Sequence, residues 1–287
     1  MQASVLTLVR GRGDHLRHLM LGLSRQTRRP AELVIAWMQE TREEALPDPG
    51  CPVRHIHVAG EPMPLAAARN RAAEAAQSDL LVFLDVDCIA SPSLVEAYAG
   101  AAAEREGLFL GEVLYLPEGA VGPVLDYDRL DRLGRVHPSK PAVPDRGVRR
   151  EMDAGELWGL SFALPKRRYL GIGGMDEAFA GYGGEETDFA VRLSASGLPF
   201  FWTAHARSYH QHHAVSIPPL HQFDAILRNA ALFHERHGRW CMTYWLGQFR
   251  DAGLIGWNED SRAIAVRRRP DAAEIAACRR GGETLFS

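Results

Sequence analysis

The sequence has few cysteines and no strong excess of charge of either sign. Its four cysteines, Cys51, Cys88, Cys241 and Cys278, lie far apart and include no Cys-x-x-Cys pair, so neither a zinc knuckle nor a disulfide framework is indicated. A formal net charge of -3 gives no basic field that would attract nucleic acid. These absences favour a reducing compartment and argue against a nucleic-acid partner.

Long apolar runs are also missing. No stretch approaches the length of a membrane span, and Arg10, Arg12 and Asp14 interrupt the apolar start of the chain too early for a signal peptide. We therefore expect a cytoplasmic protein without a transmembrane segment, with an acceptor at the inner membrane face still compatible with the sequence.

Short apolar runs alternate with helical patterns in the first third of the chain. The runs at 5–9, 33–37 and 80–84 are typical of buried strands, and helical spacing follows the first run and returns from about 64 to 76. This alternation predicts an α/β fold with a parallel, right-handed sheet. Its ligand site is expected beyond the carboxyl ends of the strands.

The second half of the chain is less regular. Residues 126–150 are rich in Asp, Arg, Pro and Gly with little periodicity, which predicts a long surface loop or lid. We expect this segment and the glycine-rich turn 179–184 to close over a bound donor and exclude water. From Pro218 onward the apolar spacing is again helical.

Two carboxylates, Asp85 and Asp87, follow the most apolar run of the chain directly. Like charges this close are costly in a partly buried cleft unless a cation lies between them. Carboxylate oxygens suit Mn²⁺ or Mg²⁺, which also bind diphosphate oxygens. The alternative is a solvated turn with two acidic residues, but the position at a strand end favours a metal site.

Four segments together resemble a known enzyme family. Residues 65–73 (LAAARNRAA) and 81–87 (LVFLDVD) look like the nucleotide-binding half of family 2 glycosyltransferases. Residues 173–177 (GGMDE) and 181–188 (GYGGEETD) are similar to the carboxyl-terminal motif of β-1,4-galactosyltransferases and polypeptide N-acetylgalactosaminyltransferases, usually Trp-Gly-Gly-Glu-Asp or Trp-Gly-Gly-Glu-Asn. The resemblance spans roughly Ser4 to His213, with its two halves in the right order.

This resemblance implies a GT-A type, Rossmann-like, mostly parallel sheet flanked by helices. The helical spacing after Pro218 adds a helical carboxyl-terminal extension to this α/β fold. The implied division is a glycosyltransferase domain at 1–213, in which 1–100 binds the nucleotide sugar and 151–213 the acceptor and metal. Residues 214–287 would be the helical extension packed on it.

The resemblance also implies catalytic roles for the two glutamates of the second motif. Glu186 occupies the position of the general base in inverting members, and Glu185 would contact the acceptor or orient the base. Carboxylates in a first helical turn, exposed by Gly183 and Gly184, agree with this role, although helix dipoles also favour acidic residues there. Because Glu186 replaces the usual Asp and Tyr182 the usual Trp, either glutamate remains a candidate for the base.

The resemblance also implies a third metal ligand. His210 lies 25 residues beyond Glu185, where the N-acetylgalactosaminyltransferases place a metal-binding histidine. It would complete the site begun by Asp85 and Asp87 and is favoured over His212 and His213. The alternative for these histidines is a solvated patch.

Donor contacts are implied at the end of the first strand. Leu8, Val9 and Arg10 would border the nucleotide, and Arg69 or Arg71 would lie near the phosphates. Asp85 would touch the ribose or a metal-bound water. The family's usual acidic residue after the second strand is absent, since the segment 37–39 reads Trp-Met-Gln. Trp158, Tyr182 and Trp202 offer faces for sugar stacking, although such aromatics often belong to a core.

These features predict a metal-dependent glycosyltransferase that moves a hexose or N-acetylhexosamine from a UDP-type nucleotide sugar to an acceptor hydroxyl group, with inversion. Mn²⁺ or Mg²⁺ is the expected cofactor, and the acceptor is a carbohydrate, a lipid-linked sugar or a small molecule. One alternative is a sugar-phosphate nucleotidyltransferase, weakly suggested by Arg10-Gly11-Arg12-Gly13, which leaves 183–188 and His210 unexplained. The other is a non-catalytic carbohydrate-binding protein on the same fold.

Overall fold

The computed structural model describes residues 1–281 and 284–286. Its first part is a parallel β-α-β arrangement, as the alternating apolar runs predict. The elements of this part are β1 (Ala3–Val9), α1 (Gly13–Ser24), β2 (Glu32–Trp37), β3 (Val53–His57), α2 (Leu65–Ala75) and β4 (Leu80–Leu84). Strand β1 pairs in parallel with β2 and β4, and β2 pairs in parallel with β3.

The remaining strands of the main sheet mix both directions. They follow in the order β5 (Cys88–Ala90), β6 (Leu108–Tyr115), β7 (Arg135–Val136), β8 (Val148–Glu151), β9 (Ser161–Pro165) and β10 (Phe200–His210). The sheet runs β3-β2-β1-β4-β9-β6-β10-β5, with β7 beside β6 and β8 beside β10. Strand β9 is antiparallel to both β4 and β6, while β6 and β10 are parallel, so the mostly parallel sheet is confirmed with an antiparallel insertion.

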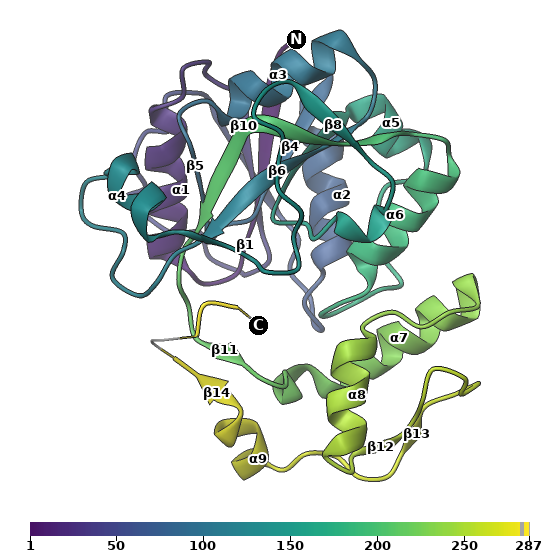
Figure 1. The fold of residues 1–287 in the computed structure, drawn as a ribbon. Coiled ribbons are helices and arrows are strands. Elements are labelled where there is room, and N and C mark those ends of the chain that lie inside the picture. The colour runs from purple at the N-terminus through teal and green to yellow at the C-terminus, as the bar shows by residue number, and fades with distance from the viewer. Residues whose placement is uncertain (282–283, 287) are drawn as a thin grey trace.

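Helices cover both faces of this sheet (Figure 1). The intervening helices are α3 (Leu94–Glu104), α4 (Tyr127–Leu133), the 3-10 helix η1 (Ala154–Glu156), α5 (Lys166–Gly171) and α6 (Glu185–Ala195). One apolar cluster joins the sheet to α1 and α3, and a second joins its other face to α2, α5 and α6. Because strand side chains alternate between faces, the fully buried strands contribute to both clusters.

The residues after β10 form a smaller, mainly helical unit below the sheet in Figure 1. Its elements are β11 (Val215–Ser216), η2 (Leu220–Gln222), α7 (Phe223–His237), α8 (Thr243–Asp251), β12 (Ile255–Gly256), β13 (Ala265–Val266), α9 (Ala272–Ala277) and β14 (Arg279–Arg280). This unit has its own apolar core, which includes Phe179 from the first part of the chain and thereby joins the two parts.

Residues 126–150 are not one long loop, contrary to the sequence prediction. They contain α4, β7 and the start of β8. Asp126 caps α4 by accepting a hydrogen bond from the Arg129 amide, and Leu130 is buried in a small apolar cluster beneath the helix. A helix of two turns has too few residues to show periodicity in the sequence.

Within the described residues, no helix is both long and apolar enough to cross a membrane.

Candidate active site

A cleft of about 760 Å³ opens beyond the carboxyl ends of β1 and β4. Its walls come from these strand ends, the start of α6, the end of β10 and the helix α8. The sequence-predicted residues that line it are Leu8, Arg10, Arg69, Asp85, Asp87, Glu185, Glu186 and His210. Parallel strands bring their ends to one edge of the sheet, which explains why residues far apart in the chain meet here.

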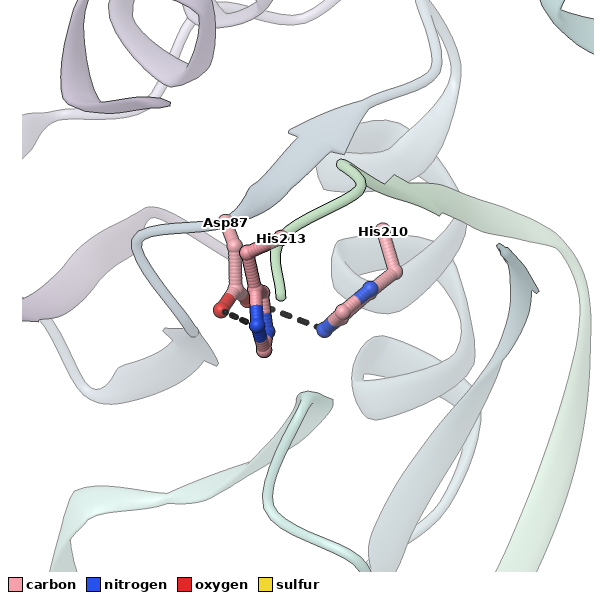
Figure 2. Close-up of side chains that lie close together, drawn as sticks. All are labelled: Asp87, His210 and His213. Carbon is pink, nitrogen blue, oxygen red and sulfur yellow. Dashed lines mark ion pairs between the residues drawn. The ribbon is translucent and has the colours of Figure 1, made fainter. Parts of the chain in front are cut away.

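One end of the cleft carries a group of side chains suited to a metal ion. Asp87, His210 and His213 each offer a ligand atom, and these atoms all lie within 4.8 Å of one another. The Nε2 atoms of His210 and His213 are each 3.6 Å from an oxygen of Asp87, and Figure 2 shows the three side chains converging. One carboxylate with two imidazoles fits Mn²⁺ better than Mg²⁺, which prefers oxygen ligands throughout.

Strand pairing produces this convergence. His210, the last residue of β10, lies opposite Cys88 of the antiparallel β5, so Asp87 is carried to the side of the histidines. The Gln211 amide donates a 2.7 Å hydrogen bond to the Asp87 carbonyl oxygen and extends this pairing by one residue. The chain then turns so that His213 returns to the same carboxylate.

The protonation states at this end also suit a cation. Burial lowers the pKa of His210, and it lowers the pKa of His213 to about 4, so both imidazoles are neutral at pH 7 and keep a free lone pair. Burial alone would raise the pKa of Asp87, but the Arg12 guanidinium and the neighbouring imidazoles, when these are protonated, outweigh it and lower the pKa of this carboxyl group. Arg12 donates a hydrogen bond to Asp87, so a second positive group lies beside this carboxylate.

The other end of the cleft gathers three carboxylates around one buried arginine. Arg69, 3% exposed on α2, has guanidinium nitrogens 3.2 Å from Glu185 and 3.6 Å from Asp85, and it donates a hydrogen bond to Glu186. Burial raises the pKa of Glu186 to about 8 and that of Asp85 to about 7, with Arg69 opposing both shifts. Asp85 therefore lies with the arginine and outside the three-residue group of Asp87.

Glycines allow the backbone to approach these carboxylates. Gly183 has φ +90°, and a Cβ atom there would lie 2.5 Å from the Met242 sulfur. Gly159 has φ +73°, and its Cβ would lie 1.9 Å from a Glu186 oxygen. A larger residue at Gly159 would therefore displace Glu186.

Two of the predicted donor contacts lie outside the cleft. Val9 is fully buried in the apolar cluster beneath α1, because its neighbour Leu8 faces the cleft and strand side chains alternate. Arg71 is exposed and pairs with Glu74 and Glu177, because two residues along a helix correspond to a rotation of about 200° away from Arg69.

The cleft also has an apolar part of its wall. Leu8, Met38, Met63 and Leu65 line the cleft, as does Arg10, which forms an ion pair with Glu61. Gln39, in the segment where the family usually has an acidic residue, accepts a hydrogen bond from the Gly11 amide.

The prediction from sequence missed several residues of the cleft or gave them too little weight. His213 was ranked below His210, and Arg12 was not assigned a role, because neither a turn after a strand nor a left-handed residue before a helix has a clear sequence signal. Met242 and Trp245 come from α8, far from either motif. Of the proposed stacking aromatics, Trp158 and Tyr182 line the cleft, whereas Trp202 is buried and donates a hydrogen bond to Glu151.

Two protein families match this chain, one over the segment with the LVFLDVD motif and one over the segment with the GYGGEETD motif. Residues 40–128 match the family described as glycosyl transferase family 2, and residues 146–214 match the family described as the N-terminal domain of galactosyltransferase. The fold is also that of known glycosyltransferases. A crystal structure of GalNAc-T7 with UDP, GalNAc and Mn²⁺ has a TM-score of 0.55 at 16% identity, covering 74% of this chain and 44% of that one.

The chain has the GT-A fold. A second GT-A structure, S. aureus TarS 1-349 in complex with UDP, has a TM-score of 0.56 at 12% identity, covering 80% of this chain and 64% of TarS. The resemblance to family 2 glycosyltransferases with a galactosyltransferase-type motif is thereby confirmed.

Two curated relatives of this chain are glucosyltransferases by name. Validoxylamine A glucosyltransferases from Streptomyces hygroscopicus subsp. jinggangensis and subsp. limoneus are each 34% identical over 154 residues, which is 47% of this chain. The chain spans only about a third of the length of these relatives, 36% and 34% respectively.

Proposed function

We propose that this chain is a metal-dependent glycosyltransferase that moves a hexose or N-acetylhexosamine from a UDP-type nucleotide sugar to an acceptor hydroxyl group, with inversion. The proposal rests mainly on one observation, which is that a metal-ligand set and a pair of carboxylates line the same cleft. The metal-ligand set Asp87, His210 and His213 lies at one end, and the carboxylates Glu185 and Glu186 lie at the other.

The metal end supports binding of the donor. A divalent cation held by Asp87, His210 and His213 would supply the positive charge that stabilises a departing nucleotide diphosphate. Arg12, released from Asp87, would then be free to contact the phosphates. Leu8, Met38 and Met63 offer an apolar surface for the base, and Arg10 lies at its border.

The carboxylate end supports activation of the acceptor. An acceptor hydroxyl is a weak nucleophile at neutral pH and needs a base within hydrogen-bond reach. Glu186, 22% exposed at its side chain, faces the cleft and has a raised pKa, which makes it a stronger base once it is deprotonated. Glu185 is more deeply buried and is suited to bind the acceptor or to orient Glu186.

The names of the structural neighbours agree with the choice of ligands. GalNAc-T7 was crystallised with UDP, GalNAc and Mn²⁺, and TarS with UDP. For this chain, UDP and Mn²⁺ are proposed on that precedent together with the nitrogen and oxygen ligands of its own cleft. We retain the division into a glycosyltransferase domain at 1–213 and a helical extension at 214–287 as part of the proposal.

The proposal is tested by a panel of nucleotide sugars incubated with the protein and Mn²⁺. We expect release of nucleoside diphosphate from a UDP-linked hexose, dependent on Mn²⁺ and abolished by excess chelator. Release that persists in excess chelator would contradict the metal dependence. Pyrophosphate released from a nucleoside triphosphate and a sugar phosphate would instead identify a nucleotidyltransferase.

A further inference from the structure

The turn in front of Glu185 and Glu186 is built from residues with unusual backbone freedom. Gly181, Gly183 and Gly184 have φ values of +77°, +90° and +90°, which residues with a side chain rarely adopt. Gly184 directly precedes α6, and no side chain caps this end of the helix. A turn of this composition does not hold one shape by itself, so the position of the two glutamates depends on contacts from elsewhere in the chain.

One side chain of α7 supplies such contacts. Asn229 is fully buried, and its Nδ2 atom lies 2.7 Å from the carbonyl oxygen of Gly183, 3.2 Å from that of Ala180 and 3.4 Å from that of Tyr182. Carbonyl oxygens only accept hydrogen bonds, so a side-chain amide, which brings two N–H donors, suits this position. A single amide group thus gathers three carbonyl groups of the turn.

A second contact from α7 holds the first turn of α6. Asp188, the last residue of the GYGGEETD motif, is fully buried, and its Oδ1 atom lies 2.9 Å from Nε2 of His237. Its Oδ2 atom accepts a 2.7 Å hydrogen bond from Arg192 of α6 itself. Helix α7, which belongs to the lower unit in Figure 1, therefore holds the glycine turn at Asn229 and the helix that follows it at His237.

The position of this turn matters to the cleft. Tyr182 and Gly183 line the cleft together with Glu185 and Glu186, which follow the turn directly. Both glutamates contact Arg69, but this arginine lies on α2, so a shift of the turn would move the glutamates relative to it. Because a misplacement of about 1 Å can cost about 10²-fold in rate, whatever fixes the turn also controls the chemistry.

We propose that Asn229 is a positioning residue for sugar transfer, which fixes the turn at 180–184 and thereby sets Glu185 and Glu186 against the bound substrates. This inference rests on the proposed function, since it assigns a further residue to that reaction. Asn229 is not among the described residues that line the cleft, so it acts through the turn rather than on a substrate. The helical extension is then part of the catalytic apparatus.

The test compares two variants of α7 in the full chain, at a temperature where both are folded. Asn229→Asp keeps the shape of the side chain but replaces its two N–H donors with an oxygen that carries at most one proton. Ile226→Val, in the apolar core around the same helix, removes one carbon atom and is the matched control. Both variants should lower the midpoint of thermal unfolding by a few degrees, so a role in stability alone would affect their turnover alike.

Turnover is measured as release of UDP, in Mn²⁺, from the UDP-linked hexose that the parent protein uses best. We expect Asn229→Asp to lower kcat at least about tenfold while the donor KM and the UDP affinity change less than about twofold, because the turn positions the glutamates and not the donor. Ile226→Val should keep the parent kcat within about twofold. An unchanged kcat in Asn229→Asp, or an equal loss in both variants, would overturn the proposal. If Asn229→Asp does not fold, Asn229→Ala replaces it with the same expectations.

Failure of the proposed function is recognised separately. If the parent protein releases no UDP from any nucleotide sugar, the proposed function is wrong, and hydrogen exchange then decides whether Asn229 fixes the turn. Amides of residues 180–188 should exchange at least about tenfold faster in Asn229→Asp than in the parent protein or in Ile226→Val. Unchanged exchange in this segment would overturn the proposal at any level of activity.

Discussion

The two ends of the cleft handle charge in opposite ways. At the metal end, burial and neighbours keep two histidines neutral and Asp87 ionised, which prepares ligands for a cation. At the carboxylate end, burial raises the pKa of Glu186 and Asp85 despite the contact with Arg69. One cleft can thus hold acidic groups for two purposes, as metal ligands at one end and as a proton acceptor at the other.

The largest effect is expected at the metal end. Asp87→Ala removes the carboxylate to which both histidines point, so turnover should fall by at least about 10² to 10³-fold, the range for loss of a principal electrostatic contact. Mn²⁺ affinity, measured by titration, should fall with it. The exposed Asp14→Ala on α1 is the control. Normal Mn²⁺ binding by Asp87→Ala would place the metal elsewhere.

At the carboxylate end, binding and chemistry should separate. Glu186→Gln should lower sugar transfer by about 10² to 10⁴-fold, as expected for lost general-base catalysis, with UDP affinity nearly unchanged. Single-turnover rates and UDP titration check this. Glu185→Gln is the companion variant: if it loses transfer while Glu186→Gln does not, the two roles are exchanged. Normal transfer by both variants would contradict the inverting mechanism.

The pH dependence should reflect the carboxylate end. A base must be deprotonated to act, and burial raises the pKa of Glu186 to about 8. Transfer should therefore rise with pH, about tenfold per unit well below this pKa, and level off above it. Single-turnover rates at saturating UDP-sugar and Mn²⁺ test this. A flat profile between about pH 6 and 8 would show that Glu186 is not the base that limits transfer.

A smaller effect is expected from the glycine behind Glu186. Gly159→Ala would place a Cβ atom 1.9 Å from a Glu186 oxygen and strain a backbone at φ +73°, so the carboxylate must move. A shift of about 1 Å can cost up to about 10²-fold in rate. The matched control is Gly100→Ala in α3, where an added Cβ meets nothing within 4 Å. Equal turnover in both variants would mean that the position of Glu186 is not critical.

The smallest effect is expected outside the cleft. Arg71→Ala should change turnover and UDP affinity by less than about twofold, because its ion pairs with Glu74 and Glu177 are exposed and such pairs contribute little. Arg69→Ala, two residues away, should instead lower transfer by at least about tenfold, since it leaves buried carboxylates without their cation. Equal losses of turnover in both variants would indicate that Arg71 contacts the donor.

Strand ends were the most predictable part of the site. Apolar runs mark β1 and β4, and parallel strands bring their ends together, so the positions of Leu8, Asp85 and Asp87 follow from local pattern. Strand alternation also explains why the Val9 side chain is buried away from the cleft, since only one of two neighbouring side chains can face it. The glutamates were found through the motif and its glycines, a stronger signal than any single acidic residue.

The other parts of the fold and the site depend on long-range contacts that local sequence patterns do not encode. Helix α4 is short, so the sequence of 126–150 looks irregular although Leu130 is buried beneath it. His213 reaches Asp87 only because the chain turns after β10. Trp245 reaches the cleft only because its ring packs against Tyr182, close to Gly183. Such long-range packing is decided by tertiary structure rather than by propensity.

The contribution of α8 to the cleft has a consequence for changing the protein. The described donor and metal residues all lie before residue 216, whereas Met242 and Trp245 lie on or next to a helix that begins at Thr243. Substitutions at these two positions can therefore change the acceptor specificity without changing the residues that bind the nucleotide. A library confined to Met242 and Trp245, screened against many acceptors with a single donor, is the most economical route to new products from this scaffold.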